Sequence, residues 1–231
     1  MTYRETSGSP ARPLPALPGA AVEAAAVAQA LHGTPLIGPD ATEATTRAAL
    51  PTAPVIHLAT HGVLDPVTPL ASAVMLADGE QLTVAELLSL RLNADLVVLS
   101  ACETGTGRVA GGDELLGLGR SLIAAGARAA VVTLWPVNDQ SAAVLMTRFQ
   151  TLRAAGTPTG EALHAAVDWL RGLSLAQVEE LFREFRSQVS ADLNPAGDHI
   201  PAGVRAISRH PVTPSTPAHP LHWAPFVLIG L

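Results

Sequence analysis

The chain has 231 residues, of which 48% are hydrophobic and 15% are charged, so it can bury a sizeable core and form one large domain. Its net charge is −6, and all 14 basic residues are arginine. The negative charge argues against a nucleic-acid partner. The lack of lysine excludes Schiff-base chemistry and a Walker-type phosphate site.

The single cysteine, Cys102, cannot form an internal disulfide or a cysteine-rich metal site. A reducing, cytoplasmic setting is therefore the simplest expectation. The first residues, MTYRETSGSPARP, lack the apolar segment of a signal peptide, and no unbroken apolar window of about 18 residues exists. We expect no membrane partner.

The first half of the chain contains clear helix, strand and turn signals after a Pro- and Ser-rich start. Residues 1–13 are expected to be flexible, and a single domain is expected over 14–231. The patterns predict helices over 19–33 and 41–50, a strand over 55–59, an Asp-Gly hairpin turn at 78–79, and a capping box of Thr83 and Glu86 before a helix.

The second half alternates buried strands with helices. The patterns predict strands over 95–100 and 128–135, a Gly-rich loop over 103–112, helices over 113–127, 139–155, 160–170 and 174–189, and a last strand over 224–231. A Pro/Gly-rich insertion over about 191–220 precedes that strand. This alternation predicts an α/β fold with a mostly parallel sheet flanked by helices.

Ligands of such sheets bind beyond the carboxyl ends of the strands. Cys102 is expected just past the strand at 95–100, and His61 just past the strand at 55–59. If these two strands are neighbours, both residues lie at one edge of the sheet. His57 is four residues earlier on the same strand and is interpreted as a packing residue.

A thiol beside an imidazole can carry out acyl transfer. The thiol pKa is ordinarily about 8.5, so the imidazole must accept its proton during attack and can later protonate a leaving amine. Developing oxyanions need N–H donors, and the backbone N–H groups of Gly62 and Cys102 are the candidates. The other interpretation is a buried cysteine that acts as a small hydrophobic residue, next to a structural histidine.

Other candidate sites have weaker support. The segment GTGRVAGG at 105–112 lacks the Gly-Lys-Ser/Thr of a phosphate cradle. The late histidines lie in a Pro-rich region, where a metal site is possible but disfavoured; they are His199, His210, His219 and His222. We expect no metal and no cofactor.

Several segments, in this order, resemble one known family. They are LPGAAVEAAAVAQAL, HLATHG, LVVLSACETGTG, GDELLGLGRSLIAAGARAAVVTLWPVND and HPLHWAPFVLIG. Together they are similar to the CHAT domain, a caspase-like module often associated with tetratricopeptide repeats.

This resemblance implies a caspase-like three-layer α/β fold and a cysteine–histidine dyad that cleaves peptide bonds in a protein or peptide substrate. It assigns the base to His61, the nucleophile to Cys102, and the oxyanion donors to Gly62 and the Cys102 backbone. Asp139 matches a motif position that we expect to be structural.

The family's domain usually begins with further sheet segments before the LPGA region. A truncated or split module is therefore one expectation, in which a partner chain completes the domain or carries the repeats. Such an enzyme would be latent without its partner.

Three functions remain open from the sequence. The first is a cysteine endopeptidase, the second a non-catalytic caspase-like interaction or signalling module, and the third a thiol acyltransferase or ligase. Asp65, Glu103 and Asp113 are candidates for a substrate pocket that takes a basic side chain. Each of them is alternatively a solvated loop acid or a helix-capping acid.

Overall fold

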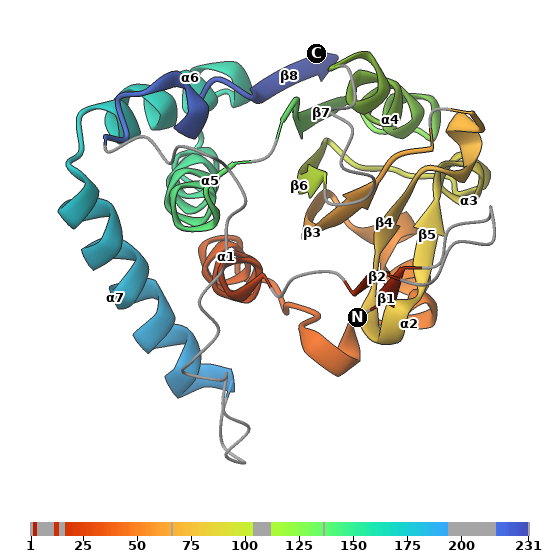
Figure 1. Cartoon of the computed structure of the whole chain (residues 1–231), viewed down its shortest axis with the longest axis horizontal. Coiled ribbons are helices and arrows are strands. Elements are labelled where there is room, and N and C mark those ends of the chain that lie inside the picture. The colour runs from red at the N-terminus through yellow and green to blue at the C-terminus, as the bar shows by residue number, and fades with distance from the viewer. Residues whose placement is uncertain are drawn as a thin grey trace. The chain divides into compact units, whose positions relative to one another are not determined.

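The computed structural model of the chain describes residues 2–3, 12–13, 17–65, 67–103, 112–135, 137–193 and 216–230 (Figure 1). The chain divides into two units. The sheet unit contains Met1–Pro15, Leu36–Pro136 and Pro225–Leu231, and the helical unit contains Ala16–Pro35 and Val137–Ala224.

The sheet unit is built on a six-stranded sheet with the order β5-β4-β3-β6-β7-β8. Its strands are β3 (Val55–Val63), β4 (Ala73–Met75), β5 (Gln81–Thr83), β6 (Leu96–Glu103), β7 (Ala129–Thr133) and β8 (Phe226–Gly230). The pairs β3–β6 and β6–β7 are parallel, and the other pairs are antiparallel. Because β5 lies two antiparallel steps from β3, the strands β5, β3, β6 and β7 run in one direction. The expected α/β class with a mostly parallel sheet is confirmed.

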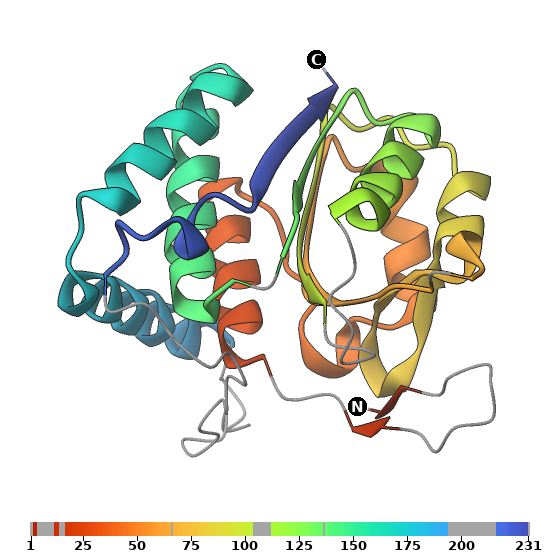
Figure 2. The same cartoon turned by 45° about the horizontal axis from the view of Figure 1, so that its top comes forward.

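The helices of the sheet unit lie together on one side of the sheet (Figure 2). They are α2 (Glu43–Ala49), α3 (Val84–Ser89) and α4 (Gly112–Ala124). Apolar residues of α3 and α4, such as Leu87 and Leu122, form one core with strand residues such as Val97 and Ala130. Burial of these side chains is the main stabilising contribution, at roughly 25 cal/mol per Å² of apolar surface.

Local signals in the sequence explain the turn and the helix start beside this core. The β4–β5 hairpin turns at Asp78 and Gly79, which both have positive φ (53° and 82°), as a tight hairpin turn requires. Thr83 and Glu86 form the expected reciprocal capping box at the start of α3. Both predictions are confirmed.

The helical unit consists of α1 (Pro18–Ala30), α5 (Asp139–Ala154), α6 (Thr159–Arg171), α7 (Leu175–Leu193) and a short 3-10 turn, η5 (Pro220–His222). Helix α5 is central, because α1, α6 and α7 all lie against it. Ser174 caps α7 through Gln177, as the sequence predicts.

Parts of two predicted segments lie outside the described residues. They are 104–111 of the Gly-rich loop and 194–215 of the Pro/Gly-rich insertion. Within the start of the chain, which was expected to be flexible, β1 (Thr2–Tyr3) pairs antiparallel with β2 (Arg12–Pro13). Across the described ranges, no helix is both long and apolar enough to cross a membrane.

Candidate functional site

His61 and Cys102 occupy neighbouring parallel strands. In the β3–β6 pair, His61 is in register with Cys102, and the pairing continues to Gly62 and Glu103. Both strands are therefore longer than the sequence predicts, and the two residues lie inside the strand ends rather than just past them. The signals for strand ends failed because each strand supplies a pairing partner that keeps the other one extended.

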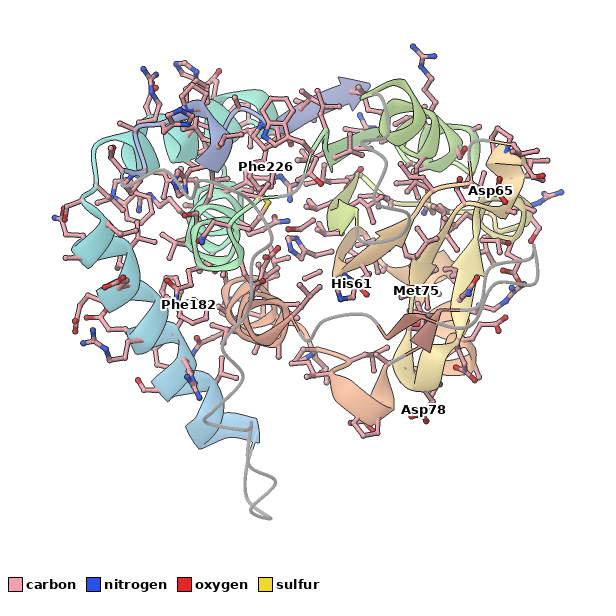
Figure 3. The ribbon with its side chains drawn as sticks, in the orientation of Figure 1. His61, Asp65, Met75, Asp78, Phe182 and Phe226 are labelled. Carbon is pink, nitrogen blue, oxygen red and sulfur yellow. The ribbon has the colours of Figure 1, made fainter. Side chains whose placement is uncertain are left out.

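The His61 side chain is buried, with only 3% of its surface exposed. It lies two residues before the end of β3, close to the neighbouring strand β4, which carries Met75 (Figure 3). The hydroxyl of Thr60 donates a 2.6 Å hydrogen bond to the carbonyl oxygen of Met75. This bond holds β4 beside the carboxyl half of β3, so the backbone around His61 is fixed on both sides.

Gly62 has strand partners on both sides, Val74 of β4 and Glu103 of β6. A residue in the middle of a sheet normally uses its N–H for a ladder hydrogen bond. The predicted role of Gly62 as an oxyanion donor therefore requires an N–H that is directed out of the ladder. That role stays a prediction.

Asp65 lies in the β3–β4 loop, and its carboxylate stabilises a turn. Its Oδ1 accepts hydrogen bonds from the N–H groups of Val67 (2.9 Å) and Thr68 (2.8 Å). The hydroxyl oxygen of Ser72 accepts the N–H of Asp65 at 3.0 Å. Figure 3 shows Asp65 well apart from His61. Its predicted place in a substrate pocket stays untested, but one carboxylate oxygen already has backbone partners.

The two other candidate pocket acids are placed by their backbone. Glu103 is the last residue of β6, next to Cys102 in the chain, and Asp113 is the second residue of α4. Both belong to segments that flank the Gly-rich loop. Their predicted role in recognising a basic side chain stays a prediction.

The histidines that could suggest a metal site have structural surroundings where they are described. His222 is buried, and its Nδ1 shares a 2.8 Å hydrogen bond with the hydroxyl of Ser141. The Nδ1 atom of His219 accepts the N–H of Leu221 at the start of η5. Within the described ranges, no three His, Cys, Asp or Glu side chains come together in a way that could hold a metal ion. His199 and His210 lie outside those ranges.

Asp139 makes the structural contact that was expected of it. It is the first residue of α5, and its carboxylate accepts the N–H of Gly19 in α1 at 2.6 Å. A Cβ atom at position 19 would lie 2.6 Å from both carboxylate oxygens, so a side chain there would force the Asp139 carboxylate to move. Burial raises the pKa of Asp139 from 3.8 to about 6, and the nearby carboxylate of Glu23 adds to the rise.

The sequence analysis did not single out two residues at the end of β7. Thr133, the last residue of the strand, is buried. Trp135 follows two residues later, and its indole Nε1 is buried without a hydrogen-bond partner. Both residues belong to the strand predicted over 128–135, and the only available signal was that this strand could end at the same edge of the sheet as the strand that carries Cys102.

The sequence matches a known protein family over almost its whole length. The CHAT domain profile matches residues 4–231. The chain belongs to the CHAT domain family. This CHAT domain chain is also 30% identical, over 188 residues, to tetratricopeptide repeat protein 28 of Mus musculus, and 29% identical to the protein of that name from Homo sapiens. Each match covers 65% of the chain but only 8% of the relative's length.

Proposed function

We propose that this CHAT domain is a cysteine endopeptidase. The observation that supports it most is the register of His61 with Cys102 on the parallel strands β3 and β6. Residues that are in register on neighbouring strands share a face of the sheet. The register supports a site in which the candidate base and the only thiol of the sequence act together, at the edge of the sheet where α/β folds bind their ligands.

The proposed reaction has two steps. The sulfur of Cys102 attacks the carbonyl carbon of the scissile peptide bond while His61 accepts the thiol proton. His61 then gives that proton to the leaving amine as the C–N bond breaks, which leaves a thioester on Cys102. Water attacks the thioester, His61 takes a proton from the water, and the carboxylic acid leaves as the thiol is restored.

The burial of His61 suits this role. A base held in a fixed position by both neighbouring strands needs no reorganisation before proton transfer. The hydrogen bond between Thr60 and Met75 contributes to this rigidity.

The test is cleavage of a diverse peptide library, read by mass spectrometry, with Cys102→Ala assayed in parallel. Cleavage by the unmodified chain alone supports the proposal and identifies the residue before the scissile bond. Equal cleavage by both proteins contradicts it. If neither protein cleaves, the alkylation rate of Cys102 decides: an unreactive thiol in the folded chain rules out the nucleophile.

A second candidate function is a non-catalytic interaction module. The relatives favour it in two ways. Their name refers to tetratricopeptide repeats, and the matched region makes up only 8% of their length. In this proposal the domain acts as one part of a larger assembly, and a repeat-containing chain is its partner. A repeat protein that binds equally well to the unmodified chain and to Cys102→Ala, with no cleavage of either protein, would support it. If the repeat protein instead switches on Cys102-dependent cleavage, the domain is a latent peptidase.

A further inference from the structure

The indole of Trp135 carries an unsatisfied hydrogen-bond donor in the sheet unit. Its Nε1 atom is buried and has no acceptor anywhere in the described parts of the chain, although the ring as a whole is only half-buried. By contrast, Nε1 of Trp223 in the helical unit donates to the carbonyl oxygen of Ala218 at 3.1 Å. A buried N–H without an acceptor is costly and rare, so this one requires an explanation.

The strand order places Trp135 at the same edge of the sheet as the candidate dyad. β6 and β7 are parallel, with Leu99 in register with Val132, so their carboxyl ends meet at one edge of the sheet. Cys102 lies near the end of β6, and Trp135 follows the end of β7 by two residues. One further ladder bond follows the last residue of β7, from the N–H of Leu134 to the carbonyl oxygen of Pro225 at 3.0 Å, and the chain then bends at Leu134 and Trp135. Since His61 is in register with Cys102, the candidate dyad and Trp135 belong to the same edge of the sheet, where β3, β6 and β7 end.

The chemistry of the indole limits what can satisfy it. An indole N–H only donates, so its missing partner is a hydrogen-bond acceptor. The donor is uncharged, which suits the neutral carbonyl oxygen of a peptide group. An extended peptide that presents its scissile carbonyl to Cys102 at this edge of the sheet carries further main-chain carbonyl oxygens on either side of the scissile bond.

We propose that Nε1–H of Trp135 donates a hydrogen bond to a main-chain carbonyl oxygen of a peptide bound beside Cys102. Trp135 is then a substrate-binding residue that recognises the backbone of the peptide rather than its side chains. The proposal rests on the proposed peptidase function, but it can be tested separately from cleavage.

The first experiment uses the single cysteine as an attachment point in the full chain. Iodoacetamide adds a carboxamidomethyl group to Cys102, which carries a carbonyl oxygen, and propyl methanethiosulfonate adds an apolar tail without one. The indole N–H signals of the three tryptophans are recorded by ¹⁵N–¹H NMR and assigned with Trp→Phe variants. We expect the carboxamidomethyl group to move the Trp135 signal downfield, and the propyl group to leave it in place.

The signal of Trp223 is the internal control, because its N–H already has an acceptor. An unmoved Trp135 signal, or equal movement with both reagents, overturns the proposal.

The second experiment measures peptide hydrolysis by Trp135→Phe, which keeps an aromatic ring but loses the donor. We expect kcat/KM for a peptide chosen from the library to fall about fivefold to tenfold, mainly through KM. Trp223→Phe should leave it unchanged. A Trp135→Phe variant with the kcat/KM of the unmodified chain contradicts the proposal. Failure of the peptidase itself would show differently, as equal cleavage by Cys102→Ala with the NMR response of Trp135 intact.

Discussion

The sheet unit and the helical unit both bury polar side chains, but in different kinds of places. Apart from Thr46 on α2, those of the described sheet unit lie where the parallel strands end; they are His61, Ser72 and Thr133. Those of the described helical unit lie on helices or on η5; they are Glu23, Ser141, Thr147, Gln150 and His222.

The two groups of buried polar side chains have different roles in the fold. The core of the sheet unit is an apolar cluster that is stabilised without polar contacts. Its buried polar side chains therefore lie at the sheet edge rather than in the core. The helical unit uses polar contacts between helices, such as Gly19 with Asp139 and Ser141 with His222. Substitutions in the first set should reduce activity more than stability, and those in the second should do the reverse.

The largest expected effect concerns the base. His61→Gln should lower peptide cleavage by roughly 10²-fold to 10⁴-fold, because the thiol loses its proton acceptor, while the unfolding temperature changes little. His57→Gln is the matched control on the same strand and should keep cleavage within a few-fold of the unmodified chain. Cleavage rates and thermal unfolding of both variants check this. Equal losses in the two variants would falsify the assignment of His61.

The next effect is a pH dependence of stability in the helical unit. The pKa of Asp139 is raised from 3.8 to about 6, so the folded chain holds this proton more tightly than the unfolded chain. Its contribution to the free energy of unfolding is therefore greatest below pH 3.8 and falls as the pH rises to about 6, by about 3 kcal/mol for about two pKa units. Asp139→Asn keeps an acceptor for Gly19 but cannot ionise.

Urea unfolding of both proteins at several pH values between 3.5 and 7 tests this. The stability of the unmodified chain relative to Asp139→Asn should fall across that range. Asp168→Asn is the control, because Asp168 is half-exposed and paired on the surface with Arg171. A difference between Asp139→Asn and the unmodified chain that does not change with pH contradicts the raised pKa.

A smaller effect is expected from the glycine that contacts Asp139. Gly19→Ala should lower the free energy of unfolding by up to about 3 kcal/mol, because the new methyl group would overlap the carboxylate. Gly33→Ala is the control, since its nearest contact would be an ordinary one at 3.9 Å. Denaturant unfolding measures both. If alanine is tolerated equally at both positions, the α1–α5 contact is looser than the structure indicates.

The smallest effect is expected for the buried hydrogen bond between Ser141 of α5 and His222 of η5. Ser141→Ala removes the hydroxyl that shares a hydrogen bond with Nδ1 of His222, and should cost about 1–2 kcal/mol. Ser187→Ala is the control, because that exposed hydroxyl bonds only to the carbonyl oxygen of Glu184 one turn earlier. Calorimetric unfolding should separate the two. Cleavage activity should change in neither variant.

Local signals were enough to predict most elements. The capping box at Thr83, the Asp-Gly turn at 78–79 and the cap at Ser174 each involve residues at most three apart, so the sequence contains all the information needed. The lengths of β3 and β6 were underestimated, because they depend on a pairing between residues about 40 apart. The sequence predicted that His61 and Cys102 lie at one edge of the sheet if their strands are neighbours. Whether the strands are neighbours, and in which register, depends on the tertiary fold.

The contacts that the sequence analysis missed are tertiary. Nothing near Trp135 in the sequence indicates that its N–H is buried without an acceptor. Likewise, the sequence alone did not indicate that a side chain at position 19 would collide with Asp139, because the two residues are 120 positions apart.

The division into two units has a consequence for how the protein can be cut. The chain passes from one unit to the other after residues 15, 35, 136 and 224. Neither unit is therefore a continuous piece that could be released by a single cleavage or expressed by simple truncation. Removing the last seven residues would take β8 from the sheet, and removing the first 35 would take α1 from the helices. A cell that regulates this protein by proteolysis would have to cut within a connecting loop and keep both fragments bound.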